Sequence, residues 1–362
     1  MPLPTVPLIA QTLIAPERVL RFSLRDWDRC IAQARAAQLL GRLEFRLRER
    51  GLEASLPAPV MPHLRSARTA ADKHAATMRW EAHCIARALA PLGLPVILLK
   101  GAAYLMRELP VATGRLFTDV DILVPRARLN EVEAALMLHG WSSTHHDAYD
   151  QRYYRTWMHE LPPMIHIQRL NALDVHHTII PPSSQLRPDP ALLMAQAQAL
   201  PDHAPLCVLA PVDMVLHSAT HLFHEGELHH GLRDISDLDC LLRDFARQPA
   251  FWDELTARSQ QLGLGRPLFY ALRFARRFFD TPVPAEVLDA LEPPGWLVRS
   301  TMDALYGRAL QPFHPSCHDA LTPAALSALY LRSHWLRMPL RLLIPHLLHK
   351  AWARPSPDAA EA

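Results

Sequence analysis

The chain has 362 residues, of which 38 are Lys or Arg and 36 are Asp or Glu, so its formal net charge is +2. Hydrophobic residues make up 49% and charged residues 20%, which is typical of a globular protein and argues against a largely disordered chain. The length suffices for two or three domains with their own cores. The near balance of charges lacks the basic excess of proteins that bind long nucleic acids, so we do not expect such a partner.

The five cysteines are scattered and form no CxxC pair, which argues against a disulfide framework and a thiolate zinc site. Residues 1–22 contain a short apolar run without a preceding basic segment or a small-residue cleavage site. No uncharged run reaches the roughly 18 residues that a membrane-spanning helix needs. We therefore expect a cytoplasmic protein.

Two helical patterns precede the first strand. Residues 23–51 keep apolar residues at three- and four-residue spacing after a possible N-cap at Ser23, and they predict one amphipathic helix. A second helical pattern from about residue 61 to 92 leads into an apolar strand at 95–99. We expect residues 1–93 to form an N-terminal helical region that buttresses the rest of the chain.

Residues 94–124 predict a strand, a short helix that begins at Lys100 and Gly101, a turn, and a second strand that carries Asp119 and Asp121. Side chains two residues apart in a strand share a face, so these two carboxylates point the same way. Like charges this close repel each other unless a cation lies between them, and Mg²⁺ prefers oxygen ligands. The pattern therefore predicts a metal-dependent phosphate chemistry.

The chain then continues with shorter elements. Residues 125–146 predict a helix and a strand, and residues 147–160 predict a loop rich in Tyr, Arg and Trp. Two β-like runs follow, and Asp174 lies on the second. Because the proline-rich residues 181–190 indicate a boundary, we expect a catalytic core over residues 94–182.

Beyond residue 190 the pattern is helical, and we expect a C-terminal helical domain over residues 190–353 and a disordered tail over 354–362. Residues 330–354 carry five basic residues and no acid. Such a segment predicts weak contact with an anionic membrane or a partner surface, and a packed pair of helices is the alternative.

Histidines gather in the predicted helical domain. His217, His221 and His224 have spacings of three and four residues, so they share a helix face and could bind zinc. One alternative is therefore a metal-dependent hydrolase that uses His and Asp, and the sequence leaves open whether His217 and His221 bind a metal. We favour the interpretation that these histidines line the cleft between the helical domain and the sheet. Arg233 and Asp237, four residues apart, predict an ion pair on a helix surface.

A glycine turn before a helix, two acids on the next strand and a third acid on a later strand match the needs of two-metal nucleotidyl transfer. Gly101 would let the backbone approach phosphates, and Lys100 and Arg115 would bind triphosphate oxygens. His176 lies two residues after Asp174 and shares its face, where it could assist the metal or the substrate.

Three segments, LLKGAAYL, GRLFTDVDILV and LDVHH, together resemble the uncharacterised nucleotidyltransferase family of the DNA polymerase beta-like superfamily, over about residues 60–250. The resemblance implies that Asp119 and Asp121 bind the metal ions, that Asp174 is the third acid, and that Arg115 is the arginine that precedes them. With the element pattern, it implies an α+β fold in which a small mixed β-sheet core is flanked by the N-terminal buttress and the C-terminal helical domain.

We therefore expect a nucleotidyltransferase that depends on Mg²⁺ or Mn²⁺ and takes an NTP, such as ATP, as co-substrate. It would transfer NMP to a hydroxyl group of a small molecule, sugar, peptide or protein and release pyrophosphate, and the resemblance implies a role in biosynthesis. A further alternative is a protein of the same fold that binds a nucleotide without turnover. The three acids argue against it, since a binding module does not need them.

Overall fold

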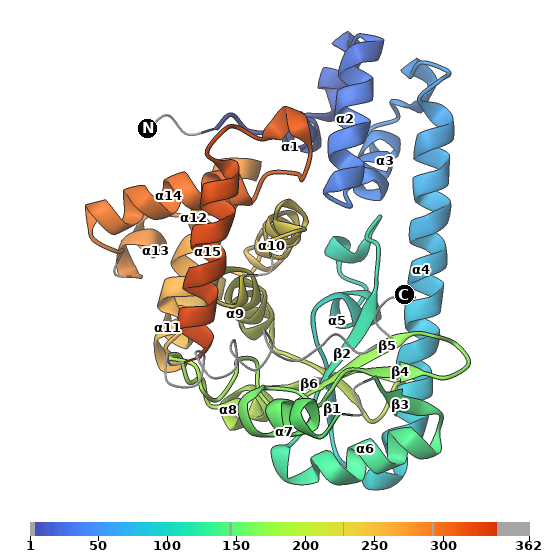
Figure 1. Ribbon diagram of the computed structural model, residues 1–362. Coiled ribbons are helices and arrows are strands. Elements are labelled where there is room, and N and C mark those ends of the chain that lie inside the picture. Colours follow the sequence, from blue (N-terminus) through green and yellow to red (C-terminus); the bar gives the residue numbers. More distant parts are fainter. Residues whose placement is uncertain (1–3, 145–146, 227, 292, 339–362) are drawn as a thin grey trace.

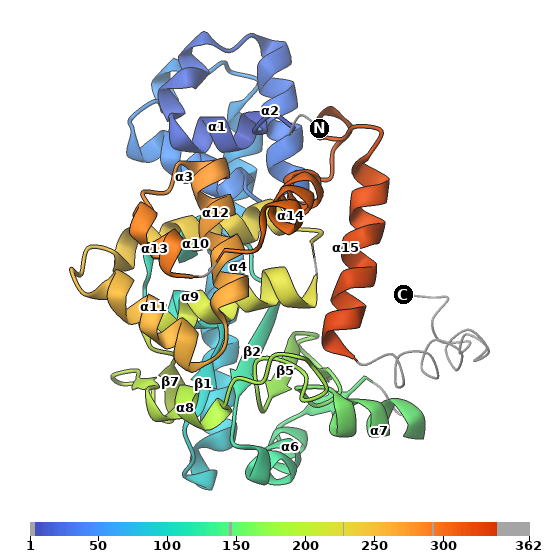
Figure 2. The same ribbon diagram turned by 90° about the vertical axis from the view of Figure 1, so that its left-hand side faces the viewer.

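The computed structural model describes residues 4–144, 147–226, 228–291 and 293–338. The first helices lie at one end of the molecule, the β-sheet lies at the other, and the C-terminal helices stand beside the space between them (Figure 1, Figure 2). The long helix α4 (Met61–Leu89) runs along one side from the first helices to the sheet (Figure 1). The architecture is α+β, which confirms the predicted fold class.

The single helix predicted after Ser23 is in fact two helices, α2 (Leu24–Ala36) and α3 (Leu40–Glu49). Ser23 caps α2 as predicted, because its hydroxyl accepts a hydrogen bond from the amide of Asp26 while the Asp26 carboxylate accepts one from the amide of Ser23. The single-helix prediction is wrong because Gln38 adopts the left-handed conformation, with a φ of 55°. This residue ends one helix and turns the chain into the next.

A seven-stranded mixed sheet forms the base of the molecule. Its strands are β1 (Val96–Leu98), β2 (Asp119–Leu123), β3 (Trp141–Ser143), β4 (Met164–His166), β5 (Ala172–His176), β6 (Gln198–Ala199) and β7 (Leu206–Val208). Their spatial order is β3-β4-β5-β2-β1-β7-β6. Strand β2 is parallel to β5 and β1 is parallel to β7, while β1 and β2 are antiparallel to each other. The strand that carries the two predicted acids is therefore central in the sheet.

The segment predicted as an aromatic loop contains a helix, α7 (Ala148–Trp157). Tyr153 contacts Trp157 edge to face, with 5.9 Å between the ring centroids. Residues four apart meet in this way on one side of a helix, so the aromatic residues that suggested a loop support a helical turn. The other helices next to the sheet were predicted, and they are α5 (Lys100–Met106) and α6 (Leu129–Leu138).

Two short strands interrupt the helical pattern beyond residue 190, and the sequence interpretation missed them. Helix α8 (Pro190–Ala195) is short, and after it β7 joins the sheet beside β1 while β6 pairs with β7. Strands of two and three residues are too short to show a period of two. The remaining helices are α9 (Pro211–Thr220), α10 (Gly231–Phe245), α11 (Phe251–Gln261), α12 (Gly265–Phe279), α13 (Ala285–Ala290), α14 (Trp296–Ala309) and α15 (Thr322–Arg337). The division into domains stays a prediction.

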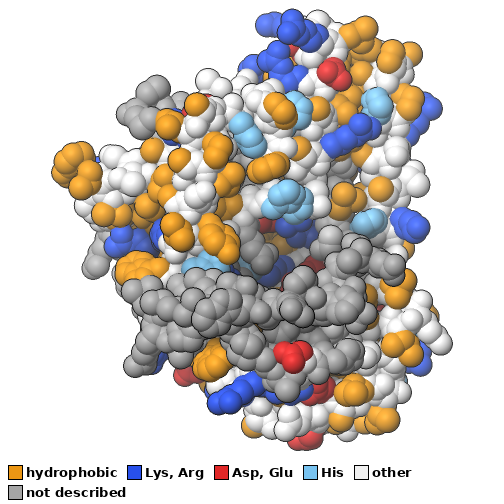
Figure 3. All heavy atoms as spheres, in the orientation of Figure 1, with side chains coloured by type: hydrophobic (Ala, Val, Ile, Leu, Met, Phe, Trp, Pro, Cys, Tyr) orange, Lys and Arg blue, Asp and Glu red, His pale blue; other side chains and the backbone are white. Residues whose placement is uncertain are grey.

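Helix α15 (Thr322–Arg337) contains the start of the basic segment 330–354, whereas most of that segment and the predicted tail lie outside the described residues. Hydrophobic side chains gather on the surface of α14 and α15 (Figure 3). Among them Trp296 and Leu331 are 72% and 68% exposed. Within the part of the chain that the structure describes, no helix combines the length and apolar character needed to cross a bilayer.

A buried ion-pair network joins α3, the turn before β2, and α10. Asp237 accepts hydrogen bonds from Nη2 of Arg42 at 2.7 Å and from Nε of Arg115 at 2.9 Å. Next to Arg42, Gly41 packs against Gly114, and a Cβ atom at Gly41 would lie 2.5 Å from the Gly114 carbonyl oxygen. The turn that leads into the acidic strand is thus held between an N-terminal helix and a C-terminal helix.

Candidate active site

The three acids predicted from the sequence come together on two adjacent strands. Asp119 and Asp121 lie on β2, and Asp174 lies on β5 directly opposite Asp121 in the parallel register. One carboxylate oxygen from each acid lies within 4.8 Å of the other two. Oδ1 of Asp174 is buried and has no hydrogen-bond partner among the described residues. Since a buried polar atom normally has a partner, this oxygen fits the role of a ligand for a divalent cation.

Asp121 carries a stabilised negative charge. Burial raises the pKa of this carboxyl, but the Lys100 ammonium, with Nζ 3.8 Å from Oδ2, and the Nε2–H of His176, 3.1 Å from Oδ1, lower the pKa by more. The net pKa of Asp121 lies well below its usual range. The acid is therefore ionised at neutral pH although it is only 6% exposed.

Asp174 has the opposite electrostatic environment. Burial, followed by the negative charges of Asp121 and Glu160, raises its pKa to about 7. Two neighbouring carboxylates with different environments titrate far apart. A divalent cation bound to oxygens of both acids would favour the ionised form of Asp174.

Lys100 lies where β1 ends and α5 begins, with a left-handed φ of 43°. Gly101 follows it, and the structure gives this glycine a steric reason. A Cβ atom at Gly101 would lie 2.5 Å from Nη1 of Arg115 and 3.1 Å from the Phe117 ring. The absence of a side chain therefore makes room for the arginine. The predicted contact of the Gly101 backbone with phosphates stays a prediction.

Arg115 is held by the protein itself. Besides its bond to Asp237, its Nη1 donates to the Leu116 carbonyl at 3.2 Å, and its guanidinium lies 5.2 Å from the centroid of Phe117. The predicted surface pair between Arg233 and Asp237 is wrong, because Arg233 donates from Nε and Nη2 to Asp234. The role of Arg115 in binding a triphosphate stays a prediction.

His176 connects the acids to two residues that sequence reasoning missed. Its Nε2 bonds to Asp121, and its Nδ1 lies 3.5 Å from a carboxylate oxygen of Glu160, which is 3.9 Å from Nε2 of His159. Burial opposes the charged imidazole, but the carboxylates of Asp121 and Glu160 raise the pKa of His176 to about 9. One ligand atom each from His159, Glu160 and His176 lie close enough together to hold an ion. His177 is buried beside them, as expected for packing.

Helices α9 and α10 contribute side chains next to the acids. Burial and then the charge of Lys100 lower the pKa of His217, on α9, to about 3, and the same two causes lower the pKa of His221. Burial opposes the charge of Arg233, on α10, while Asp234, Asp237 and then Asp119 raise its pKa. Both histidines therefore lie within electrostatic range of Lys100, and Arg233 lies within electrostatic range of Asp119. The interpretation that the histidines line the cleft stays a prediction.

A separate zinc site receives no geometric support from the described residues. His224 lies in the π-helical turn His221–Glu225 and bonds to the hydroxyl of Ser184 at 2.6 Å. The groups of three possible metal ligands within the described ranges include neither His217 nor His221. Asp119 lies 114 positions before Arg233 in the chain, so no local sequence pattern relates these two residues.

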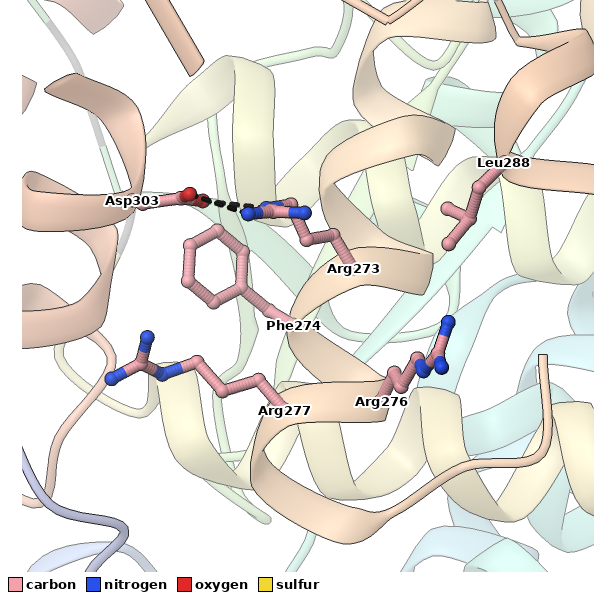
Figure 4. A pocket seen from close by; sticks show the side chains of 6 residues that line it. All are labelled: Arg273, Phe274, Arg276, Arg277, Leu288 and Asp303. Carbon is pink, nitrogen blue, oxygen red and sulfur yellow. Dashed lines mark hydrogen bonds and ion pairs between the residues drawn. The ribbon is translucent and has the colours of Figure 1, made fainter. Parts of the chain in front are cut away.

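A cavity of about 280 Å³ lies away from the acids, among α12, α13 and α14 (Figure 4). Three arginines line it, and Arg273 forms two hydrogen bonds with Asp303. Figure 4 shows the side chains of Arg276 and Arg277 extending in different directions. They do not converge on one point, so the cavity lacks the geometry of an anion site.

The mixed sheet with three convergent carboxylates on neighbouring strands defines a nucleotidyltransferase type of site. A family model described as "Uncharacterised nucleotidyltransferase" matches residues 23–280, well over half of the chain, and the chain belongs to this family. No curated protein and no solved structure matches the chain. The membership confirms the resemblance that the three sequence segments indicated.

Proposed function

We propose that the protein transfers NMP from an NTP to a hydroxyl group of an acceptor and releases pyrophosphate, with Mg²⁺ or Mn²⁺ as cofactor. The observation that carries this proposal is the group of Asp119, Asp121 and Asp174, with one buried carboxylate oxygen that has no hydrogen-bond partner among the described residues. Family membership supports the class of reaction. The identity of the NTP, for which ATP is one candidate, belongs to the proposal.

Asp119, Asp121 and Asp174 would hold the metal ions, which when bound activate the acceptor oxygen and stabilise the leaving pyrophosphate. Asp174 would also help to remove the proton of the acceptor hydroxyl. His176 keeps Asp121 in place through its hydrogen bond, since it is itself fixed between two carboxylates. Lys100 reaches toward the acids from the end of β1 and would bind phosphate oxygens.

Arg233 is a further candidate for binding phosphate, and it comes from the helical side of the site. Its side chain is 15% exposed, and its guanidinium is held by Asp234 and by Gln38, which accepts a hydrogen bond from Nη1 at 2.7 Å. An arginine fixed in this way presents its remaining N–H donors in a defined direction. Gly101 and Arg115 would complete the phosphate site, as the sequence predicts.

The nearly neutral charge of the chain favours a small molecule, a sugar, a peptide or a protein side chain as acceptor over long nucleic acid. A biosynthetic role and a cytoplasmic location fit this proposal. Contact of residues 330–354 with an anionic membrane or a partner would be an additional property, and the exposed Tyr330, Leu331 and Trp335 of α15 support it. Binding of a nucleotide without turnover is the second candidate, which the three convergent acids disfavour because a binding module does not need them.

The proposal is tested by incubating each of the four α-labelled NTPs with Mg²⁺ or Mn²⁺ in a lysate of the producing cell. We expect the wild type to label an acceptor and the Asp119→Asn/Asp121→Asn variant to label nothing. If the wild type binds Mg²⁺ and NTP without labelling any species, the protein is a binding module. If NTP binding is independent of metal and of these acids, the proposal is wrong.

A further inference from the structure

A cavity of about 400 Å³ lies beside Asp119, between α4 and the first residues of β2 and β5. Met78, Phe117 and Val120 contribute an apolar surface, and residues of α4, of the start of β2 and of the start of β5 line the rest. A cavity of this size can enclose a small organic molecule or one end of a larger one. Because Asp119 belongs to the group of three acids, a ligand in the cavity would lie next to the metal ligands.

The residues that line the cavity come from α4, from β2 with the residues just before it, and from the start of β5, and Lys100 is not among them. Strand β2 has β1, which leads to Lys100, on one side and β5, which carries Asp174, on the other. Ala172 and Asn171, at the start of β5, line the cavity. A triphosphate requires cationic groups such as Lys100. The space on the β5 side is therefore available for the second substrate.

His74 gives the cavity a hydrogen-bond acceptor. Its Nδ1 lies 2.7 Å from the carbonyl oxygen of Phe117. A carbonyl oxygen can only accept, so Nδ1 of His74 must carry the hydrogen, and in the neutral ring Nε2 is left as an acceptor. A hydroxyl or amide of a ligand in the cavity can donate to this nitrogen.

Three charged residues line the cavity, namely Lys73, Glu81 and Asp119. Glu81 lines it, but its carboxylate is neutralised by Nε and Nη2 of Arg169 and accepts a further hydrogen bond from Asn171 at 2.8 Å. Lys73 lines the cavity from α4 and forms no ion pair within the described ranges. When Asp119 binds a metal ion, its negative charge no longer balances the positive charge of Lys73 on the cavity wall. The cavity therefore suits a ligand with a negative group.

We propose that this cavity binds the acceptor, and that the acceptor is a hydroxyl compound with an apolar body and an anionic group. The inference rests on the proposed function. Lys73 pairs with the anionic group, the apolar body lies against Met78 and Phe117, and Nε2 of His74 accepts a hydrogen bond that orients the reacting end toward Asp119. In the transfer, the acceptor oxygen bonds to the α-phosphorus, the bond from that phosphorus to the bridging oxygen breaks, pyrophosphate leaves, and the hydroxyl proton passes to Asp174.

The first test fills the cavity. Thr77 is an exposed residue of α4 that lines it, and Ala76 is an exposed neighbour that does not. We expect Thr77→Trp to reduce labelling of the acceptor in the lysate by about tenfold or more, a loss of more than about 1.4 kcal/mol in transition-state stabilisation. Binding of Mg²⁺ with NTP, followed by calorimetry, stays unchanged. The matched variant Ala76→Trp keeps wild-type labelling.

The outcomes separate this inference from the proposed function. Equal labelling by wild type and Thr77→Trp overturns the acceptor site and leaves nucleotidyl transfer intact. No labelling by the wild type removes the proposed function and this inference together. Lys73→Glu tests the charge: a fall in labelling of about tenfold supports an anionic acceptor, and a rise overturns it.

His74 is tested by a variant that keeps its structural bond. The amide nitrogen of Asn at position 74 can donate to the Phe117 carbonyl as Nδ1 does, whereas Asn offers no atom in the place of Nε2. We expect His74→Asn to keep the thermal midpoint and the affinity for NTP, and to raise the acceptor concentration needed for half-maximal labelling, measured by diluting the lysate. An unchanged dilution curve would overturn the role of His74.

Discussion

The substitution Asp237→Asn should destabilise the protein strongly, because it removes a carboxylate that bonds to both Arg42 and Arg115. The side chains of these three residues are 4%, 6% and 10% exposed. The carboxylate accepts one charge-assisted hydrogen bond from each arginine. An Asn side chain has one acceptor oxygen, so its amide group would face one of the two guanidinium groups. Removing one partner of a buried ion pair lowers the free energy of unfolding by about 3–5 kcal/mol.

The loss is measured as a shift in the urea or thermal unfolding midpoint, followed by circular dichroism at pH 7. The control is Asp244→Asn on the same helix, whose partner Arg247 is 77% exposed. A pair of this kind contributes about 0–1 kcal/mol. We also expect Asp237→Asn to weaken NTP binding, since Arg115 loses its support. If both variants shift the midpoint equally, the network does not hold the turn before β2, and the reasoning is refuted.

Three further predictions concern packing, pH and metal. Gly101→Ala should lower stability by about 1–3 kcal/mol, because the new methyl group displaces Arg115. Gly265→Ala should not lower it, because a Cβ atom there meets no atom within 4 Å. The unfolding midpoints of the two variants test this difference. Burial holds the pKa of His224 at about 4, against about 6.5 in an unfolded chain, so the unfolded state binds more protons and stability falls as the pH drops from 6.5 to 4. Replacing His224 with Gln should flatten this fall in unfolding free energy with pH. Comparing the variant with the wild type isolates the effect of His224 from that of Asp174, whose raised pKa acts in the opposite direction. Parallel curves of stability against pH for the two proteins would contradict the assignment. Chelation with EDTA should abolish labelling and Mg²⁺ should restore it, while labelling that persists in EDTA would exclude the metal-dependent reaction.

The acids could be predicted because their pattern is local. Asp119 and Asp121 share a strand, and the alternation with buried Val120 and Ile122 fixes which way they point. The start of α2 was predictable for the same reason, since a capping box is contained within four residues. The position of Asp174 opposite Asp121 required the family resemblance, because no local rule pairs residues 53 positions apart.

Contacts between distant segments could not be predicted from periodicity. Asp237 lies 195 positions from Arg42 and 122 from Arg115, so helical spacing suggested the nearby Arg233 as its partner. Glu160 meets His176 through an isolated β-bridge, which leaves no repeating pattern. Strands β6 and β7 were missed because they are very short and are stabilised by pairing, β7 with β1 and β6 with β7.

The position of β7 decides how the protein can be cut for experiments. Val96–Leu98 pairs with residues 206–208 on one side and with the acidic strand on the other. A fragment limited to residues 94–182 would contain all three acids but expose the backbone donors and acceptors of an apolar central strand. Such an open edge pairs readily with a second copy. Expression of that fragment should therefore give aggregates, and a useful boundary lies beyond residue 208.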